Sequence, residues 1–243
     1  MGGINVVITM GGLGSRFRKA GYTVPKYMIE VKGKTLFHWS MLSLKNLLPH
    51  TEQFIFIAMQ DDSVEIEKFI AAECKNIGIK KYQLILIDYL TDGQATTAML
   101  AEKYWLKYNP LLVYNIDTYV EPVGMSFEEI RGDGFIPCFK GEGDHWSFVK
   151  LNEAGEAVEV KEKERISENC TIGAYYFSSC ELYKELYTDF YADERNLTKG
   201  EKYIAPLYGE LIRRGKKVYI SDIPKEMVHV LGTPEELKIF EAE

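Results

Sequence analysis

Three glycines and two basic residues near the start of the chain have the types and spacing of a phosphate-binding site. With the serine between them, the set is Gly11, Gly12, Gly14, Ser15, Arg16 and Lys26. Glycines allow a sharp turn that an anion can approach closely, and the backbone N–H groups of such a turn can bind phosphate oxygens. An arginine can hold phosphate through two parallel hydrogen bonds, and a lysine adds a compact positive charge. These residues therefore predict a site for a phosphorylated ligand.

Two other kinds of glycine loop do not fit this stretch. A P-loop has Lys and then Ser or Thr directly after its last glycine, whereas Ser15 and Arg16 follow Gly14 here. The dinucleotide-binding loop needs a small residue three positions after its second glycine, and Phe17 stands there. The residues leave one alternative open, a tight turn beside cations that are simply solvated, as surface cations usually are.

Positive charge is concentrated beside the glycine loop. Residues 16–34 hold six Lys or Arg side chains and one acid, Glu30, which gives +5, whereas the whole chain has a formal net charge of −7. A local basic patch attracts a small polyanion. The acidic balance of the whole chain argues against a general nucleic-acid binder.

Length and composition set the outer limits. The 243 residues are 46% hydrophobic, which is enough for a sizeable core. We find neither a signal-peptide pattern nor eighteen consecutive apolar residues, so the sequence predicts neither export nor a membrane span. The cysteines have no metal-ligand spacing and are typical of buried, reduced thiols in a cytoplasmic protein; they are Cys74, Cys138, Cys170 and Cys180.

Apolar runs alternate with helical patterns in the first half of the chain. Short apolar runs predict strands at 4–8, 53–59, 83–87 and 111–116. Apolar residues at helical spacing predict helices around 36–48, 63–72 and 97–107. This order predicts a parallel sheet with crossover helices, in which ligands bind beyond the carboxyl ends of the strands. The glycine loop and Asp117 both follow such strand ends.

The second half of the chain has a different pattern. It predicts shorter strands at 132–140, 145–151, 158–161, 172–177 and 217–220, and helices around 180–191, around 203–214 and from 233 onward. We find no repeat, linker or low-complexity stretch. The sequence therefore predicts one domain over residues 1–243, with two lobes at about 1–120 and 121–243.

Asp117 is the second candidate for chemistry. Its carboxylate at the end of a buried strand could coordinate Mg²⁺ that bridges phosphate oxygens. Taken alone, an Asp at a strand end more often caps a turn or a helix. Together with the glycine loop, the metal role is favoured. A third candidate, the pair Glu162 and Lys163, would on its own be an ordinary solvated surface.

Taken together, these residues resemble the nucleotidyltransferases that activate phosphorylated sugars and related alcohols, such as glucose-1-phosphate thymidylyltransferase and shorter relatives from capsule and lipopolysaccharide pathways. The resemblance spans nearly the whole chain, and its most specific part is the glycine loop with Pro25 and Lys26 downstream. It implies a Rossmann-like α/β fold of the nucleotide-diphospho-sugar transferase type, with a mixed, mainly parallel sheet flanked by helices. It also implies a nucleotide-binding first lobe and an acceptor-binding second lobe.

The family resemblance implies a role for each candidate residue. Arg16 and the amides of Gly11, Gly12, Gly14 and Ser15 would hold the β- and γ-phosphates of a nucleoside triphosphate, and Lys26 would stabilise charge at the α-phosphate. The base would be read near Gly93 and Gln94, and Asp117 would bind the Mg²⁺ cofactor. The acceptor phosphate would contact Lys163, an acceptor hydroxyl would contact Glu162, and Trp146 would wall the acceptor pocket.

Two departures from the family pattern bear on the chemistry. Many relatives carry a second metal-binding aspartate in an Asp-x-Gly-Thr motif, but here Val230 stands in its place. Asp222 is a further carboxylate that could substitute, and His229 is a poor ligand for a hard cation. The second departure is Ser147, where sugar-using relatives often have glycine. It leaves room for a non-sugar acceptor. The oligomeric state is open, and a homo-oligomer is compatible with the sequence.

The leading function is therefore Mg²⁺-dependent transfer of a nucleoside monophosphate from CTP, UTP or dTTP to a sugar 1-phosphate, with release of pyrophosphate, for surface polysaccharide synthesis. The first alternative is a cytidylyltransferase that uses phosphocholine or a phosphorylated amino acid. A glycosyltransferase of related architecture would need an Asp-x-Asp metal motif, whereas the chain has Asn115-Ile116-Asp117. A non-catalytic nucleotide sensor is the remaining alternative, and Val230 is the only argument for it.

Overall fold

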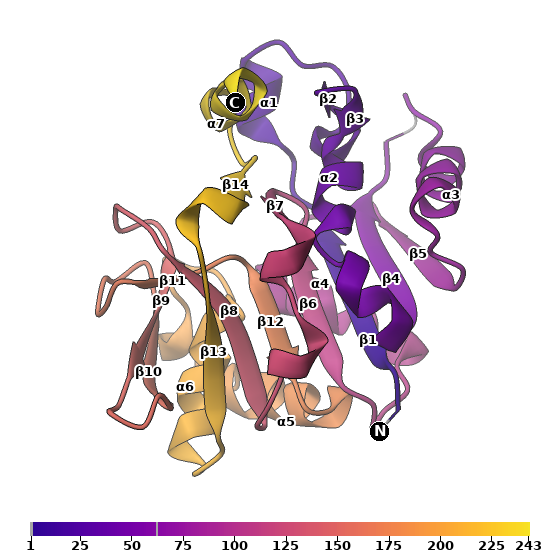
Figure 1. Ribbon diagram of the computed structural model, residues 1–243. Helices are drawn as coiled ribbons and strands as arrows, with labels where there is room; N and C mark the ends of the chain where they lie inside the picture. Colours follow the sequence, from indigo (N-terminus) through magenta and orange to yellow (C-terminus); the bar gives the residue numbers. More distant parts are fainter. Residues whose placement is uncertain (1, 62) are drawn as a thin grey trace.

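The structure is a computed structural model of the chain and describes residues 2–61 and 63–243. A mixed sheet of ten strands runs through both halves of the sequence (Figure 1). Four of its strands are parallel, in the order β5-β4-β1-β6. Their bounds are β1 Ile4–Met10, β4 Thr51–Met59, β5 Tyr82–Ile87 and β6 Leu111–Asn115. The parallel sheet with crossover connections predicted for the first half is confirmed.

The remaining strands extend this sheet beyond β6. Strand β12 (Ala174–Phe177) pairs antiparallel with both β6 and β8 (Gly134–Lys140), and β13 (Val218–Ile223) runs parallel to β8. The antiparallel end of the sheet comprises β9 Ser147–Leu151, β10 Ala157–Glu162 and β11 Asn169–Thr171.

Two small antiparallel pairs lie outside the main sheet. Strands β2 (Glu30–Val31) and β3 (Lys34–Thr35) form one, and β7 (Thr118–Val120) and β14 (Val228–Val230) form the other. The second pair matters for the site because β7 begins directly after Asp117. It brings the C-terminal segment, from Val228 onward, back to the end of β6.

Helices cover both faces of the sheet. Their bounds are α1 Ser15–Lys19, α2 Leu36–Leu42, α3 Ile66–Ile77, α4 Gln94–Met99, α5 Cys180–Phe190, α6 Ala205–Arg213 and α7 Pro234–Ala242. Short 3-10 helices occupy Lys26–Met28, Lys45–His50, Glu102–Tyr104, Pro122–Gly124, Phe127–Glu129, Glu194–Asn196 and Lys225–Met227.

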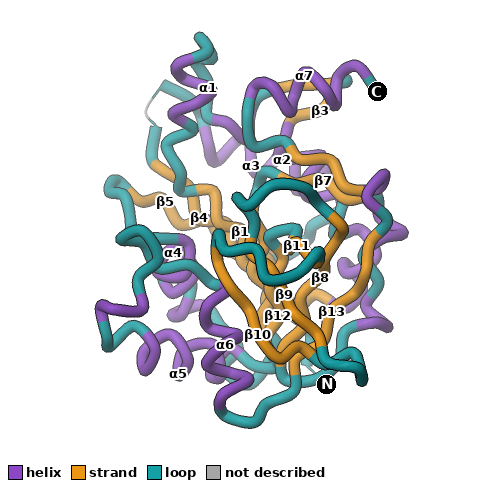
Figure 2. The backbone as a smooth tube through the Cα atoms, turned by 90° about the vertical axis from the view of Figure 1, so that its left-hand side faces the viewer, coloured by secondary structure: helices purple, strands orange, loops and turns teal. Residues whose placement is uncertain are grey.

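Alternating side chains of β1 divide the core between the two faces. Val6 and Ile8 belong to a cluster with apolar residues of α2 and α3, whereas Val7 belongs to a second cluster with residues of α4, α5 and α6. The helices of the second cluster lie together on the left of Figure 2. A third cluster joins Phe17 of α1 to Leu237 and Phe240 of α7, which fixes the last helix beside the glycine loop.

Several element bounds differ from the sequence-based predictions. The helix predicted at 36–48 ends at Leu42, because the Ser43 hydroxyl turns inward, accepts from Val120 N at 2.9 Å and lies 3.1 Å from the Tyr114 hydroxyl. The helix predicted at 97–107 is α4 followed by a 3-10 turn, and the helix predicted at 63–72 is α3, which begins and ends later. Strands β7, β11 and β14 were not predicted, because three residues are too few to show a period.

The four cysteines are buried and free, as expected. In the part of the chain that the structure describes, no helix combines the length and the apolar character that crossing a bilayer requires.

Candidate active site

A cavity of about 540 Å³ opens where β1 and β6 end. Ligands bind at this edge in open parallel sheets. The cavity wall includes all of the predicted nucleotide and metal residues, namely Gly11, Gly12, Gly14, Ser15, Arg16, Lys26, Gly93, Gln94 and Asp117. Residues from four separate stretches of the sequence therefore meet in one cavity.

The glycine loop connects β1 to α1. Gly14 adopts a left-handed conformation, with φ of 59°, and a Cβ there would lie 3.4 Å from the Lys26 Cβ. The positive φ therefore favours glycine at this turn, and the Pro25–Lys26 segment lies in van der Waals range of it. A Cβ on Gly12 would meet no atom of residues 2–61 and 63–243 within 4 Å, so the described part of the chain leaves space beside it. Arg16 is exposed and makes no side-chain hydrogen bond or ion pair with any residue that the structure describes, so its guanidinium is available to a ligand.

Lys26 and Asp117 form the central contact of the cavity. The Lys26 Nζ atom lies 2.8 Å from Asp117 Oδ2, although ninety-one residues separate the two in sequence. The Lys26 side chain is 14% exposed and the Asp117 side chain is 37% exposed. The Lys26 side chain is therefore largely buried, whereas the Asp117 carboxylate is accessible to a ligand.

The turn before α4 supplies the far wall of the cavity. Gly93 has φ of 143° and ψ of 172°, a conformation essentially restricted to glycine. A Cβ at this position would lie 2.3 Å from the Lys202 carbonyl oxygen. The neighbouring Gln94 donates from Nε2 to the Thr9 hydroxyl at 3.0 Å, which ties the turn to the end of β1. The approach of Lys202 was not predicted, because a long-range backbone contact leaves no local pattern.

Asn115 is a further cavity residue that sequence reasoning did not single out as a binding residue. Its side-chain Oδ1 is buried and has no hydrogen-bond partner among the described residues. A Cβ on Gly173, which has φ of 80°, would lie 2.1 Å from the Asn115 Nδ2 atom. Gly173 therefore makes room for the asparagine side chain beside Asp117. In the sequence, the position of Asn115 two residues before Asp117 was the only indication that it lies in the cavity.

The predicted acceptor residues Glu162 and Lys163 lie outside this cavity, at the end of β10. The Lys163 backbone has φ of 56°, and its N–H donates to the Trp146 carbonyl at 2.8 Å. The Lys163 Nζ atom is hydrogen-bonded to the Tyr203 hydroxyl and lies 4.0 Å from the centre of that ring. Lys202, the neighbour of Tyr203 in sequence, packs on Gly93. The segment with Lys202 and Tyr203 therefore connects the cavity wall at Gly93 to the predicted acceptor residue Lys163.

The Glu162 carboxylate is enclosed by its neighbours. Ser147 donates a hydrogen bond to Glu162 Oε2, and its hydroxyl also lies 3.2 Å from the Tyr175 hydroxyl. Burial raises the pKa of Glu162, and the hydrogen bond from Ser147 and the charge of Lys163 partly oppose that shift. Ser147 is thus a buried support for Glu162.

Trp146 lines a second cavity, of about 790 Å³, together with His229 and Val230. Its indole N–H donates to the Glu142 carbonyl at 2.8 Å, and its ring meets Phe139 edge to face. Val230 therefore lies at a different cavity from Asp117.

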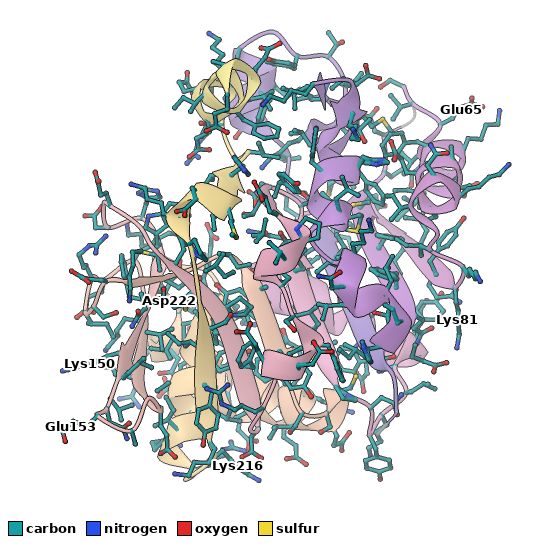
Figure 3. The ribbon with its side chains drawn as sticks, in the orientation of Figure 1. Glu65, Lys81, Lys150, Glu153, Lys216 and Asp222 are labelled. Carbon is teal, nitrogen blue, oxygen red and sulfur yellow. The ribbon has the colours of Figure 1, made fainter. Side chains whose placement is uncertain are left out.

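Asp222 lies on β13 (Figure 3) and is exposed. Its carboxylate pairs loosely with Lys140 Nζ at 3.8 Å. It does not line the cavity that contains Asp117. The suggestion that it substitutes for the second metal aspartate is therefore wrong.

No family model matches the chain, and no curated protein matches it. Solved structures match it over nearly its whole length. A nucleoside-diphosphate-sugar pyrophosphorylase from Vibrio cholerae is 34% identical, with a TM-score of 0.89 and coverage of 98% of this chain and 100% of that chain.

Two more distant structures are similar in fold alone. An inositol-1-phosphate CTP transferase from T. maritima is 16% identical, with a TM-score of 0.75 and coverage of 99% of this chain and 94% of that chain. A CTP:phosphocholine cytidylyltransferase from Streptococcus pneumoniae is 13% identical, with a TM-score of 0.73 and 98% coverage of both chains. The fold class predicted from the sequence is confirmed.

Proposed function

Because this chain belongs to the nucleotidyltransferase family of the nucleoside-diphosphate-sugar pyrophosphorylases and is an enzyme of that family, we propose that it joins the nucleoside monophosphate of a nucleoside triphosphate to a phosphorylated small molecule. Pyrophosphate is the second product. One observation carries this proposal: Lys26 and Asp117 meet at 2.8 Å in a cavity that the glycine loop also lines.

The reaction needs no protein nucleophile. An oxygen of the acceptor phosphate attacks the α-phosphorus, the bond from that phosphorus to the bridging oxygen of the β-phosphate breaks, and pyrophosphate leaves with the electron pair. Catalysis then consists of positioning and charge neutralisation. Arg16 and the amides of the glycine loop would bind the β- and γ-phosphates, and Lys26 would stabilise the charge at the α-phosphate.

The residues at the cavity fit Mg²⁺. Asp117 and the unpartnered Asn115 Oδ1 are hard oxygen donors, which this cation prefers. Within residues 2–61 and 63–243, no group of three His, Cys, Asp or Glu side chains could hold a metal. Mg²⁺ is usually held by one or two carboxylates together with substrate phosphates and water. When bound, it would neutralise phosphate charge, and Asp117 would be one of its protein ligands.

We further propose a pyrimidine nucleotide and a sugar 1-phosphate as the substrates, used in the synthesis of a surface polysaccharide. The CTP-dependent transferases among the similar structures support the pyrimidine, and the Vibrio cholerae pyrophosphorylase supports the sugar. Gly93 and Gln94 would read the base. Lys163 would bind the acceptor phosphate, Glu162 would accept a hydrogen bond from an acceptor hydroxyl, and Trp146 would form part of the acceptor wall.

A pyrophosphate-release assay tests this function. CTP, UTP, dTTP, ATP and GTP are each combined, in the presence of Mg²⁺, with a panel of sugar 1-phosphates, phosphocholine and phosphorylated amino acids. We expect release with one kind of acceptor and one triphosphate together, and with neither alone. The variant D117N should lose this activity, whereas D222N, which removes a carboxylate outside the cavity, should keep it. Equal activity of D117N and the wild type would contradict the proposal.

A further inference from the structure

Position 230 offers no second carboxylate to the metal, but the carboxylates of Asp117 and Glu236 both border Gly232. Leu231 N donates to the Asp117 carbonyl at 2.7 Å, which holds the segment after β14 against the aspartate. The next residue, Gly232, lines the same cavity as Asp117. Helix α7 begins just beyond it, at Pro234.

Glu236 in the first turn of α7 has a carboxylate oxygen that no described residue hydrogen-bonds. Its backbone N–H donates to the Thr233 hydroxyl at 3.1 Å, which is the usual cap of such a helix. Its side-chain Oε2, however, is buried and has no hydrogen-bond partner among the described residues. Burial of a charged oxygen is unfavourable unless a hydrogen-bond donor or a cation compensates for the lost water.

Gly232 separates the two carboxylates by an open gap. A Cβ on this glycine would lie 3.2 Å from Glu236 Oε2 and 3.6 Å from Asp117 Oδ2. The point that the missing Cβ leaves free is therefore bordered by one oxygen of each acid. Gly232 is not in a left-handed conformation, so the backbone does not require glycine there. A Cβ would nevertheless be tight against Glu236 Oε2 and would occupy the space between the two carboxylates.

We propose that Glu236 supplies the second carboxylate for the Mg²⁺ that Asp117 binds, and that Gly232 keeps the space between them open. The inference rests on the proposed function, since it concerns the metal of that reaction. Glu236 thereby takes over the role that Val230 cannot perform. The adjacent Glu235 is exposed and carries the same charge at the start of the same helix, so it provides a matched control.

Mn²⁺ binding tests the assignment without any turnover. Mn²⁺ prefers the same hard oxygen ligands as Mg²⁺, and its dissolved form has an electron paramagnetic resonance signal that disappears on binding. Each protein is titrated with Mn²⁺ alone: the wild type, E236Q, E235Q and D117N. We expect E236Q and D117N to weaken Mn²⁺ affinity by about tenfold or more, and E235Q to leave it unchanged.

A second variant guards against an effect of Glu236 on folding. G232A adds one methyl group at the gap and should weaken Mn²⁺ affinity, while circular dichroism and urea unfolding report an intact fold. Wild-type affinity in E236Q, or a wild type that binds no more Mn²⁺ than D117N, would overturn the assignment. Pyrophosphate release by the wild type reports on the proposed function separately, so the two can fail independently.

Discussion

We expect Gly93→Ala to reduce both the stability of the enzyme and its affinity for the nucleotide. The new Cβ would lie 2.3 Å from the Lys202 carbonyl oxygen and 2.6 Å from the Lys202 nitrogen. Both are backbone atoms, so no side chain can rotate away. The two segments must separate, and the cavity wall moves with them.

The magnitude follows from the contacts that the separation breaks. Lys202 N donates to the Asp92 carbonyl at 2.8 Å, and Ala95 N donates to the Lys202 carbonyl at 3.0 Å. Each such bond contributes about 1 kcal/mol net. A backbone conformation that only glycine readily adopts adds about 1–3 kcal/mol for alanine. The free energy of unfolding should therefore fall by about 4 kcal/mol.

Urea unfolding measures this loss, and Gly155→Ala is the matched control. Gly155 also has a positive φ, of 76°, but no atom lies within 4 Å of its missing Cβ. Alanine there should cost only the left-handed backbone penalty, about 1–2 kcal/mol. Steady-state kinetics should show a raised KM for the nucleotide in Gly93→Ala alone. Equal unfolding free energies for the two variants, with an unchanged KM, would refute the reasoning.

Three further predictions concern the charged and hydroxyl groups of the site. Lys26→Met should lower kcat/KM by about 10²–10³-fold in the pyrophosphate assay. It should reduce the free energy of unfolding in urea melts by only about 1 kcal/mol, because the Asp117 carboxylate stays partly hydrated. The control Lys19→Met, at an exposed position in α1, should change neither quantity. Burial raises the pKa of Glu162. Its contribution to stability is therefore present at pH values below the ordinary glutamate pKa of 4.5 and is lost as the pH rises through the folded-state pKa. Urea melts from pH 4 to pH 7 should show Glu162→Gln gaining stability relative to the wild type, and a pH-independent difference would count against the burial argument. Tyr203→Phe removes the hydroxyl that contacts Lys163, so it should raise KM for the acceptor and leave KM for the nucleotide unchanged; an effect on the nucleotide alone would show that Lys163 does not serve the acceptor.

The parallel half of the sheet could be predicted because each of its strands is a short run rich in apolar residues. Strand β1 is apolar apart from Asn5 and Thr9 and almost wholly buried, so it stands out from the helical patterns around it. The antiparallel half of the sheet was harder to predict from the sequence. Strand β14 has only three residues, and its pairing with β7 depends on tertiary contacts that no local pattern shows.

The candidate site likewise combines residues that local motifs predicted with residues that only long-range contacts bring in. The glycine loop and Lys26 are local motifs, and the structure brings them to Asp117, whose place at a strand end was predicted. Lys202 reaches Gly93 from a distant part of the chain, so nothing in the sequence indicated their contact. Glu236 was hidden for another reason, because a glutamate three residues after Thr233 is typical of a helix cap. The roles of Trp146, Glu162 and Lys163 stay predictions.

The most direct test of the central claim follows the phosphorus atoms of the nucleotide. The wild type is incubated with Mg²⁺, the acceptor found in the release assay and its triphosphate, labelled either at the α- or at the γ-phosphate. We predict that the α-label appears in a new diphosphate-linked product and the γ-label in pyrophosphate. An α-label left in free nucleoside monophosphate or diphosphate, with none joined to the acceptor, would contradict nucleotidyl transfer.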